Sequence, residues 1–177
     1  MAMVARLPAI GELNALTKPE FAAAMAPLFE GAPHFLARLA AGRPFATYAD
    51  LWPRALAIAR SLPEADQLEL INAHPRLGAP PAEVSALSYR EQGYDREAAE
   101  LEAGRLASEL ERLNQAYEAR FGFRFCIFVN GRSRAALLPV IEAALEADRA
   151  VEIRRALGEV VAIAADRART LGLMPAP

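Results

Sequence analysis

The sequence has few of the residues on which much enzyme chemistry depends, because its 177 residues include one cysteine, one lysine and two histidines. Cys126 alone cannot form an internal disulfide, which favours a reducing compartment. Lys18 precedes a proline at an apparent helix start, where a lysine is usually solvated, so Schiff-base chemistry is set aside. Because zinc sites draw on several His and Cys ligands, a site without metal is the default expectation.

The sequence also lacks a long hydrophobic run and an excess of positive charge. The formal net charge is -2 and no stretch is basic enough to follow a phosphate backbone, which argues against a nucleic-acid or membrane-surface role. No apolar run reaches the ~18 residues of a membrane span, and the start MAMVARLPAI has no long apolar core of a secretion signal. These absences favour a cytoplasmic protein whose partner is a small molecule.

Apolar positions at helical spacing are plentiful. Hydrophobic residues make up 54% of the chain and charged residues 24%, which suits the core of one domain. Leu110, Leu113 and Tyr117 illustrate the helical spacing. The pattern predicts an all-α, single-domain bundle of about seven helices, near 18–30, 33–41, 48–60, 62–73, 95–120, 135–147 and 150–171. Two predicted starts have capping-box spacing: Thr17 with Glu20, and Ser61 with Glu64.

Two segments interrupt the helical pattern. Residues 75–88 contain three prolines and a glycine, so we expect an irregular loop there. Residues 122–130 alternate like a short strand and end at a turn signal, but no partner strand is evident. We therefore expect an extended segment buried against helices, whose backbone amides can meet a loop, water or a ligand.

His74 is the best general acid/base candidate in the chain. It lies at the end of a predicted helix and precedes Pro75, which disfavours helical geometry in the residue before it and so holds the imidazole at a rigid helix exit. The alternative is a structural histidine that interacts with the helix dipole. The other histidine, His34, is expected to be a packed or surface helix residue rather than a ligand.

Ser88, Glu91 and Gln92 would share one helical turn shortly after the Pro-rich loop. They either present a hydroxyl, a carboxylate and an amide to the His74 loop, or only start a helix, because serine three residues before glutamate is also a capping box. Spacing does not decide between these two interpretations. Asn114 and Tyr117 are expected on a helix face and in the core. Three arginines could bind a carboxylate bidentately, although any one in so arginine-rich a chain is more often at the surface: Arg132, Arg134 and Arg167.

The order of these segments resembles the 2-oxo-4-hydroxy-4-carboxy-5-ureidoimidazoline (OHCU) decarboxylase family. The resemblance runs from about residue 11 to 171, and its pieces are LNALTKPEF, AHPRLG at 73–78, SYREQ at 88–92, LNQAY at 113–117, FGFRF at 121–125 and DRARTL in the last helix. It implies a single all-α domain over 1–177 with its core at 11–171, usually dimeric and without metal or organic cofactor.

The resemblance also assigns residues. It implies that His74 and Glu91 are catalytic. The substrate contacts that it implies come from Pro75, Ser88, Gln92, Phe123, Phe125, Ile127 and Arg167. The implied enzyme is a carboxy-lyase that converts OHCU to (S)-allantoin in urate degradation.

The implied reaction needs few catalytic groups. The departing carboxylate is attached to C4, next to a C5=N imine that can accept the electron pair as CO2 leaves. What remains is positioning and proton transfer. His74 would act as base and acid and Glu91 would polarise the ring or hydroxyl. Ser88 and Gln92 would contact the ring and ureido groups, and Arg167 would bind the anion.

Two alternatives stay open beside this reaction. Gly93-Tyr94-Asp95 replaces the usual Ala-Gly-Leu of the family, and the loop before Ser88 is a few residues short. Both changes would shape the pocket, so a related ureido or imidazole acid is an alternative substrate. The second alternative is a noncatalytic helical binding module that kept the fold.

Overall fold

The structure, a computed structural model, describes residues 7–93 and 100–170. Within these two ranges the chain forms nine α-helices and one short 3-10 helix, and no β-strand. The all-α prediction is therefore confirmed. The chain divides into two compact units, the first made of residues 1–73 and 157–177 and the second of residues 74–156. Among the described helices none is long and apolar enough to cross a membrane.

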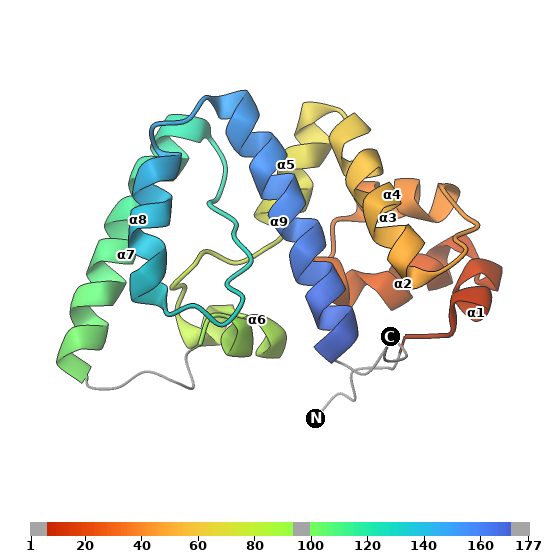
Figure 1. The fold of residues 1–177 in the computed structure, drawn as a ribbon, viewed down its shortest axis with the longest axis horizontal. Coiled ribbons are helices and arrows are strands. Elements are labelled where there is room, and N and C mark those ends of the chain that lie inside the picture. Colours follow the sequence, from red (N-terminus) through yellow and green to blue (C-terminus); the bar gives the residue numbers. More distant parts are fainter. Residues whose placement is uncertain (1–6, 94–99, 171–177) are drawn as a thin grey trace. The chain divides into compact units, whose positions relative to one another are not determined.

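Unit 1 contains the helices drawn from red to yellow in Figure 1 and the C-terminal part of the last helix. Its elements are α1 (Ile10–Ala15), α2 (Lys18–Phe29), α3 (Pro33–Ala41), α4 (Tyr48–Ser61), α5 (Glu64–Asn72) and residues 157–170 of α9 (Arg149–Thr170). Helix α3 packs against α2, α4 and α5. Its buried Phe35 meets Phe29 of α2 edge to face at 4.8 Å.

The two predicted capping boxes have different outcomes. Thr17 caps α2, because its hydroxyl accepts a hydrogen bond from the Glu20 amide and its own amide donates to the Glu20 carboxylate. The prediction of a capping box at Ser61 is wrong. Leu62 is extended, so α5 begins only at Glu64 behind Pro63, and the Ser61 hydroxyl donates to the carbonyl of Ile58 instead.

Unit 2 contains a 3-10 turn (Pro81–Glu83), α6 (Ala86–Glu91), α7 (Glu100–Phe121), α8 (Arg134–Ala144) and residues 149–156 of α9. Helices α7 and α8 lie side by side, and the chain that joins them is the long non-helical trace in Figure 1. Residues 124–129 of this connection form neither helix nor strand. The predicted extended segment is confirmed, and the expectation of one domain over 1–177 stays a prediction.

Two short helices escape the sequence pattern. Helices α1 and α6 have six residues each, too few for an amphipathic repeat to be recognised. The predicted loop at 75–88 is correspondingly too long, because α6 begins at Ala86. Its cap is Ser85, whose hydroxyl accepts a hydrogen bond from the Ser88 amide at 3.2 Å. Of the predicted helix near 95–120, residues 95–99 lie outside the described residues.

Candidate active site

His74 is a buried residue at the beginning of unit 2. It follows directly after Ala73, the C-cap of α5, and is 4% exposed. Its carbonyl oxygen accepts a hydrogen bond from Nη1 of Arg124 at 3.3 Å, so the extended segment contacts the backbone of the histidine itself. Pro75, which follows, is half-buried. The sequence predicts that His74 ends a helix. In the structure it lies one residue beyond the C-cap of α5.

The loop after His74 is held by Gln92, the last residue of the S-x-x-E-Q motif. Gln92 is 6% exposed and is the C-cap of α6. Its Oε1 accepts from the amide of Gly78 at 2.7 Å, and its Nε2 donates to the carbonyl of Arg76 at 3.1 Å. Because an amide side chain both accepts and donates, one residue satisfies two opposite backbone groups. The motif at 88–92 is thereby joined to the loop that carries the histidine.

Asn114 of α7 holds the same loop from another helix. It is 2% exposed, and its Nδ2 donates to the carbonyl of Leu77 at 2.9 Å. Gly78 has a φ of +79°, and a Cβ built there would lie 2.9 Å from Cδ1 of Leu110, also on α7. The positive φ and the close approach both favour glycine at this position. Backbone atoms of three consecutive loop residues are thus fixed by the side chains of Gln92 and Asn114.

Arg76 adds an ionic contact between this loop and α7. Its Nε donates to Oε1 of Glu118 at 2.6 Å and its Nη2 donates to Oε2, so the pair is bidentate. The hydrogen bond with Glu118 raises the pKa of the Arg76 guanidinium. The side chain of Arg76 points to α7 while its carbonyl is held by Gln92, which leaves the loop little freedom.

Ser88 and Glu91 lie inside or at the end of α6. Ser88 is buried and Glu91 is half-buried. Because Ser85 caps this helix, the interpretation of Ser88 and Glu91 as a capping box is wrong. Their spacing of three residues places both side chains on the same face of the helical turn.

The extended segment after α7 presents the other predicted contacts. Phe123, Phe125 and Ile127 are all buried. The rings of Phe123 and Phe125 meet Tyr117 edge to face, with centroids 5.6 and 5.2 Å apart. Arg155 of α9 stacks over Phe125 at 4.7 Å and donates from Nη1 to the carbonyl of Cys126 at 2.9 Å. Ring stacking and this carbonyl contact hold a segment that has no partner strand.

A buried ionic group lies behind this segment. The hydroxyl of Tyr117 donates to Oε2 of Glu152 at 2.7 Å, and Nη2 of Arg155 donates to the same oxygen at 2.9 Å. Burial, followed by the hydrogen bond to Glu152, raises the pKa of the Tyr117 hydroxyl. The tyrosine therefore stays a hydrogen-bond donor at neutral pH, and its predicted place in the core is confirmed.

Arg167 belongs to unit 1 and is 2% exposed. Its Nη1 donates to the carbonyl of Pro27 at 3.0 Å, and its Nη2 donates to Oε1 of Glu30 at 2.8 Å. Both contacts are at the C-terminal end of α2, where a cation is favoured by the helix dipole. The guanidinium thus contributes to packing within unit 1.

The structure brings most predicted residues into unit 2. Direct hydrogen bonds join the His74 loop to Gln92, and the His74 carbonyl to Arg124. Sequence reasoning underrated Asn114, although it stands three residues before Tyr117 on the same apolar stripe, where a buried amide must find a partner. Arg132 and Arg134 differ, because Arg132 is exposed and Arg134 is buried.

Comparison with known proteins places these residues in a family context. A family model described as OHCU decarboxylase matches residues 14–169. The chain is 31% identical to the 2-oxo-4-hydroxy-4-carboxy-5-ureidoimidazoline decarboxylase of Haloferax volcanii, over 86% of this chain and 89% of that protein. It is 30% identical to the protein of that name from Amia calva, over 93% and 95%.

Two further relatives are longer than this chain. The uric acid degradation bifunctional protein PucL of Bacillus subtilis is 33% identical over 86% of this chain, which spans 30% of the length of PucL. The homologous bifunctional protein of Bacillus sp. strain TB-90 is likewise matched over 30% of its length.

Two solved structures share the fold. A crystal structure of OHCU decarboxylase in the presence of (S)-allantoin matches with a TM-score of 0.66 and 24% identity, over 83% of this chain and 96% of that one. A crystal structure of (S)-allantoin synthase matches with a TM-score of 0.64 and 20% identity, over 93% of this chain and 54% of that one.

Proposed function

The chain belongs to the OHCU decarboxylase family, and from this premise we propose that it decarboxylates 2-oxo-4-hydroxy-4-carboxy-5-ureidoimidazoline to (S)-allantoin. The observation that carries the proposal is the match over residues 14–169, which includes the whole stretch from His74 to Gln92. The hydrogen bonds of Gln92 to the loop after His74 support it, because they join the two motifs that the reaction would use.

The proposed reaction breaks one carbon–carbon bond. The C4–carboxylate bond is cleaved, its electron pair enters the neighbouring C5=N imine, and CO2 leaves. The C4 hydroxyl then loses its proton to become a carbonyl, and C5 gains a proton on one face. The nitrogen of the former imine also takes up a proton, so the carboxylate form of OHCU gives CO2 and allantoin with a net uptake of one proton.

The roles proposed for the side chains follow from these steps. His74 takes the hydroxyl proton and delivers a proton to C5, and Glu91 polarises the ring or hydroxyl. Ser88 contacts the ring or ureido group, and Pro75 shapes the wall beside it. The extended segment supplies contacts through Phe123, Phe125 and Ile127. Burial of His74 and of these three residues supports a site from which water is largely excluded.

Gln92 has a second proposed role beside substrate contact. Its Oε1 and Nε2 both bond to the backbone of the His74 loop, at Gly78 and Arg76. We therefore treat it as a positioning residue that acts on substrate chiefly through the placement of His74.

The direct test supplies freshly generated OHCU and follows (S)-allantoin by circular dichroism. The expected result is enantiomerically pure product at a rate well above that of the spontaneous reaction. His74→Asn should abolish that excess rate and Glu91→Gln should reduce it, whereas the matched variant Glu83→Gln, at an exposed carboxylate in the same unit, should not. Folded protein without any excess rate would refute the proposal and favour the noncatalytic binding module.

The role of Arg167 as the carboxylate ligand needs its own test, because its guanidinium already contacts Pro27 and Glu30. If Arg167 binds the substrate, Arg167→Lys should raise KM while Glu30→Gln leaves KM unchanged. A loss of thermal stability in both variants with an unchanged KM would assign Arg167 to the packing of unit 1 alone.

Assembly, compartment and cofactor use stay part of the proposal. We expect a homodimer in the cytoplasm that needs no metal or organic cofactor. Light scattering after size-exclusion chromatography tests the dimer, since a monomer at micromolar concentration would contradict it. Full decarboxylase activity after exhaustive dialysis against EDTA is the expected result for a metal-independent reaction.

A further inference from the structure

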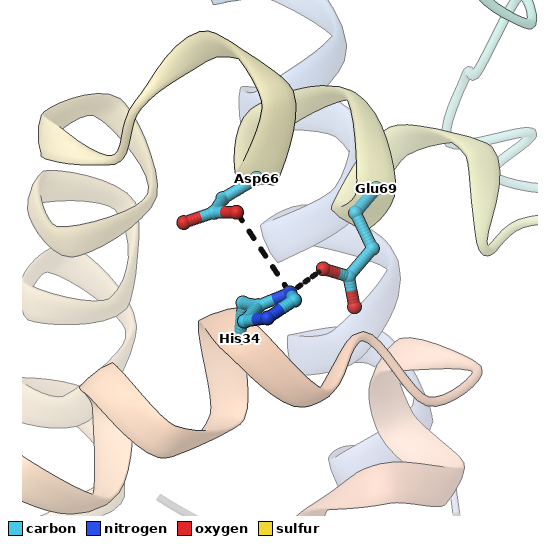
Figure 2. A group of neighbouring side chains, drawn as sticks. All are labelled: His34, Asp66 and Glu69. Atoms are coloured by element: carbon cyan, nitrogen blue, oxygen red, sulfur yellow. Dashed lines mark hydrogen bonds and ion pairs between the residues drawn. The ribbon is translucent and has the colours of Figure 1, made fainter.

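Three side chains of unit 1 that the proposed reaction does not use lie close together. His34 stands in the first turn of α3, and Asp66 and Glu69 stand three residues apart on α5, which packs against α3. Figure 2 shows the imidazole of His34 between the two carboxylates. One donor atom from each residue lies within 4.8 Å of the other two. Residues at i and i+3 share one face of a helix, which explains how α5 presents both carboxylates to one partner.

The charges in this cluster are unbalanced. Nδ1 of His34 hydrogen-bonds to Oε2 of Glu69 and lies 3.7 Å from Oδ1 of Asp66. In the described part of the chain, no arginine or lysine pairs with either carboxylate, whereas Glu118 and Glu152 each face an arginine. Two carboxylates thus share one imidazole, and a dication would neutralise them.

We propose that His34, Asp66 and Glu69 bind one divalent first-row transition-metal ion of the zinc class. An imidazole nitrogen with two carboxylate oxygens is a donor set for such ions, whereas Ca²⁺ and Mg²⁺ prefer oxygen ligands alone. Ligand atoms of a tetrahedral zinc site lie about 3.4 Å apart, so rotation about the outer side-chain bonds brings these three into range. Three protein ligands leave the remaining coordination position to water.

The exposure of the residues fits a site that fills from solvent. The side chain of His34 is 68% exposed, so of the two predicted positions, packed or at the surface, the second is observed; those of Asp66 and Glu69 are 28% and 29% exposed. A bound ion would connect the first turn of α3 to the middle of α5. Because the unfolded chain does not preserve this arrangement, binding would stabilise unit 1 by mass action. The proposal is independent of the decarboxylase reaction.

The first experiment titrates the full-length, EDTA-treated protein with Zn²⁺. We expect one saturable site by calorimetry, and the ¹⁵N resonances of the His34 ring should shift with the first equivalent while those of His74 do not. Since the chain has only these two histidines, the assignment is direct. A shift of His74 instead, or no saturation by millimolar Zn²⁺, would overturn the proposal.

The second experiment uses variants of each ligand. His34→Ala, Asp66→Asn and Glu69→Gln should each weaken Zn²⁺ binding at least about tenfold, because loss even of an outer-shell partner commonly has that effect. Glu64→Gln removes a carboxylate from the same helix without removing a ligand, so its affinity should stay within about twofold of wild type. Equal weakening by all four variants would indicate general charge attraction and would contradict a specific site.

Thermal unfolding gives a third readout. Zn²⁺ should raise the Tm of the wild-type protein and of Glu64→Gln by similar amounts, and it should raise the Tm of Glu69→Gln by a smaller amount at the same Zn²⁺ concentration. A Zn²⁺-dependent rise in Glu69→Gln equal to that of the wild type would count against the three-residue site. Decarboxylase activity provides no criterion in this series, so failure of the metal site and failure of the proposed function are separate results.

Discussion

Two non-helical segments of unit 2 are held in chemically different ways. The backbone of the loop after His74 is fixed by neutral amides, since Gln92 and Asn114 bond to backbone atoms of residues 76–78, and the Arg76 side chain adds an ion pair with Glu118. The extended segment after α7 is fixed by the guanidinium group of Arg155, which donates to the carbonyl of Cys126 and stacks over Phe125. An amide can pair with both N–H and C=O groups, whereas a guanidinium can pair only with C=O groups.

This difference assigns different tasks to the two segments. The amide contacts bond to both N–H and C=O groups of the loop backbone. They therefore determine the position of His74, which precedes this loop. The arginine contacts serve carbonyls alone, and the N–H groups of the extended segment must find their acceptors elsewhere. In the proposed reaction the loop places the acid/base group, and the extended segment contacts the substrate through Phe123, Phe125 and Ile127.

The largest effect should come from removing the ionic support behind the extended segment. Glu152→Ala would remove the buried carboxylate that accepts hydrogen bonds from the buried Tyr117 hydroxyl and from Arg155, whose side chain is 25% exposed, and should lower the free energy of unfolding by about 3 kcal/mol. Urea denaturation measures this change. Glu109→Ala is the matched control, because Glu109 and Arg112 form an exposed pair with the same spacing of three residues. That control should be indistinguishable from wild type, and equal losses would show that burial of the Glu152 pair is immaterial.

Removal of the Gln92 amide that holds the loop should affect catalysis more than stability. Gln92→Leu breaks both contacts of the amide to the backbone and should lower kcat about 100-fold, the usual consequence of an approximately 1 Å misplacement of a catalytic group. KM should change little if Gln92 acts mainly by positioning His74. Steady-state kinetics separates the cases, since a rise in KM at constant kcat would make Gln92 only a substrate ligand. Gln115→Leu, at an exposed position on α7, serves as the control.

The two segments can also be compared by replacing one glycine in or next to each of them with alanine and measuring the loss of stability. Gly78 in the loop and Gly122 before the extended segment have nearly equal φ angles of +79° and +80°. Gly122→Ala should lose about 1–2 kcal/mol from the left-handed conformation alone, because no atom lies within 4 Å of the new Cβ. Gly78→Ala should lose about 1 kcal/mol more, since its Cβ would meet Leu110. Equal losses, measured by denaturation, would mean that Leu110 moves aside freely.

Both segments could be predicted from local sequence features, whereas the side chains that hold them in place could not. Three prolines and a glycine mark the loop, and alternating apolar residues mark the extended segment, so short windows of sequence suffice. The supports act at long range. Asn114 and its partner Leu77 are 37 residues apart, and Arg155 and its partner Cys126 are 29 apart. A polar side chain does not specify its partner until tertiary packing has placed both.

The same limit applies to the motif residues. The spacing of Ser88 and Glu91 fits both a capping box and a catalytic turn, and only the cap at Ser85 decides between them. Likewise, in so arginine-rich a chain the sequence does not show that Arg155, rather than one of its exposed neighbours, contacts the extended segment. The sequence therefore predicts the chemical groups of the candidate site more readily than the contacts that position them.

The smallest effect should come from the exposed end of the extended segment. Arg132 donates to the carbonyls of Phe128 and Val129, and its side chain is exposed, so water can replace both hydrogen bonds. Arg132→Gln should therefore change the free energy of unfolding by less than about 0.5 kcal/mol and leave kcat and KM unchanged. A fall in kcat comparable to that of Gln92→Leu would show that the segment is positioned from its exposed end. The distinction between a loop backbone fixed by amides and a segment fixed by Arg155 would then have to be abandoned.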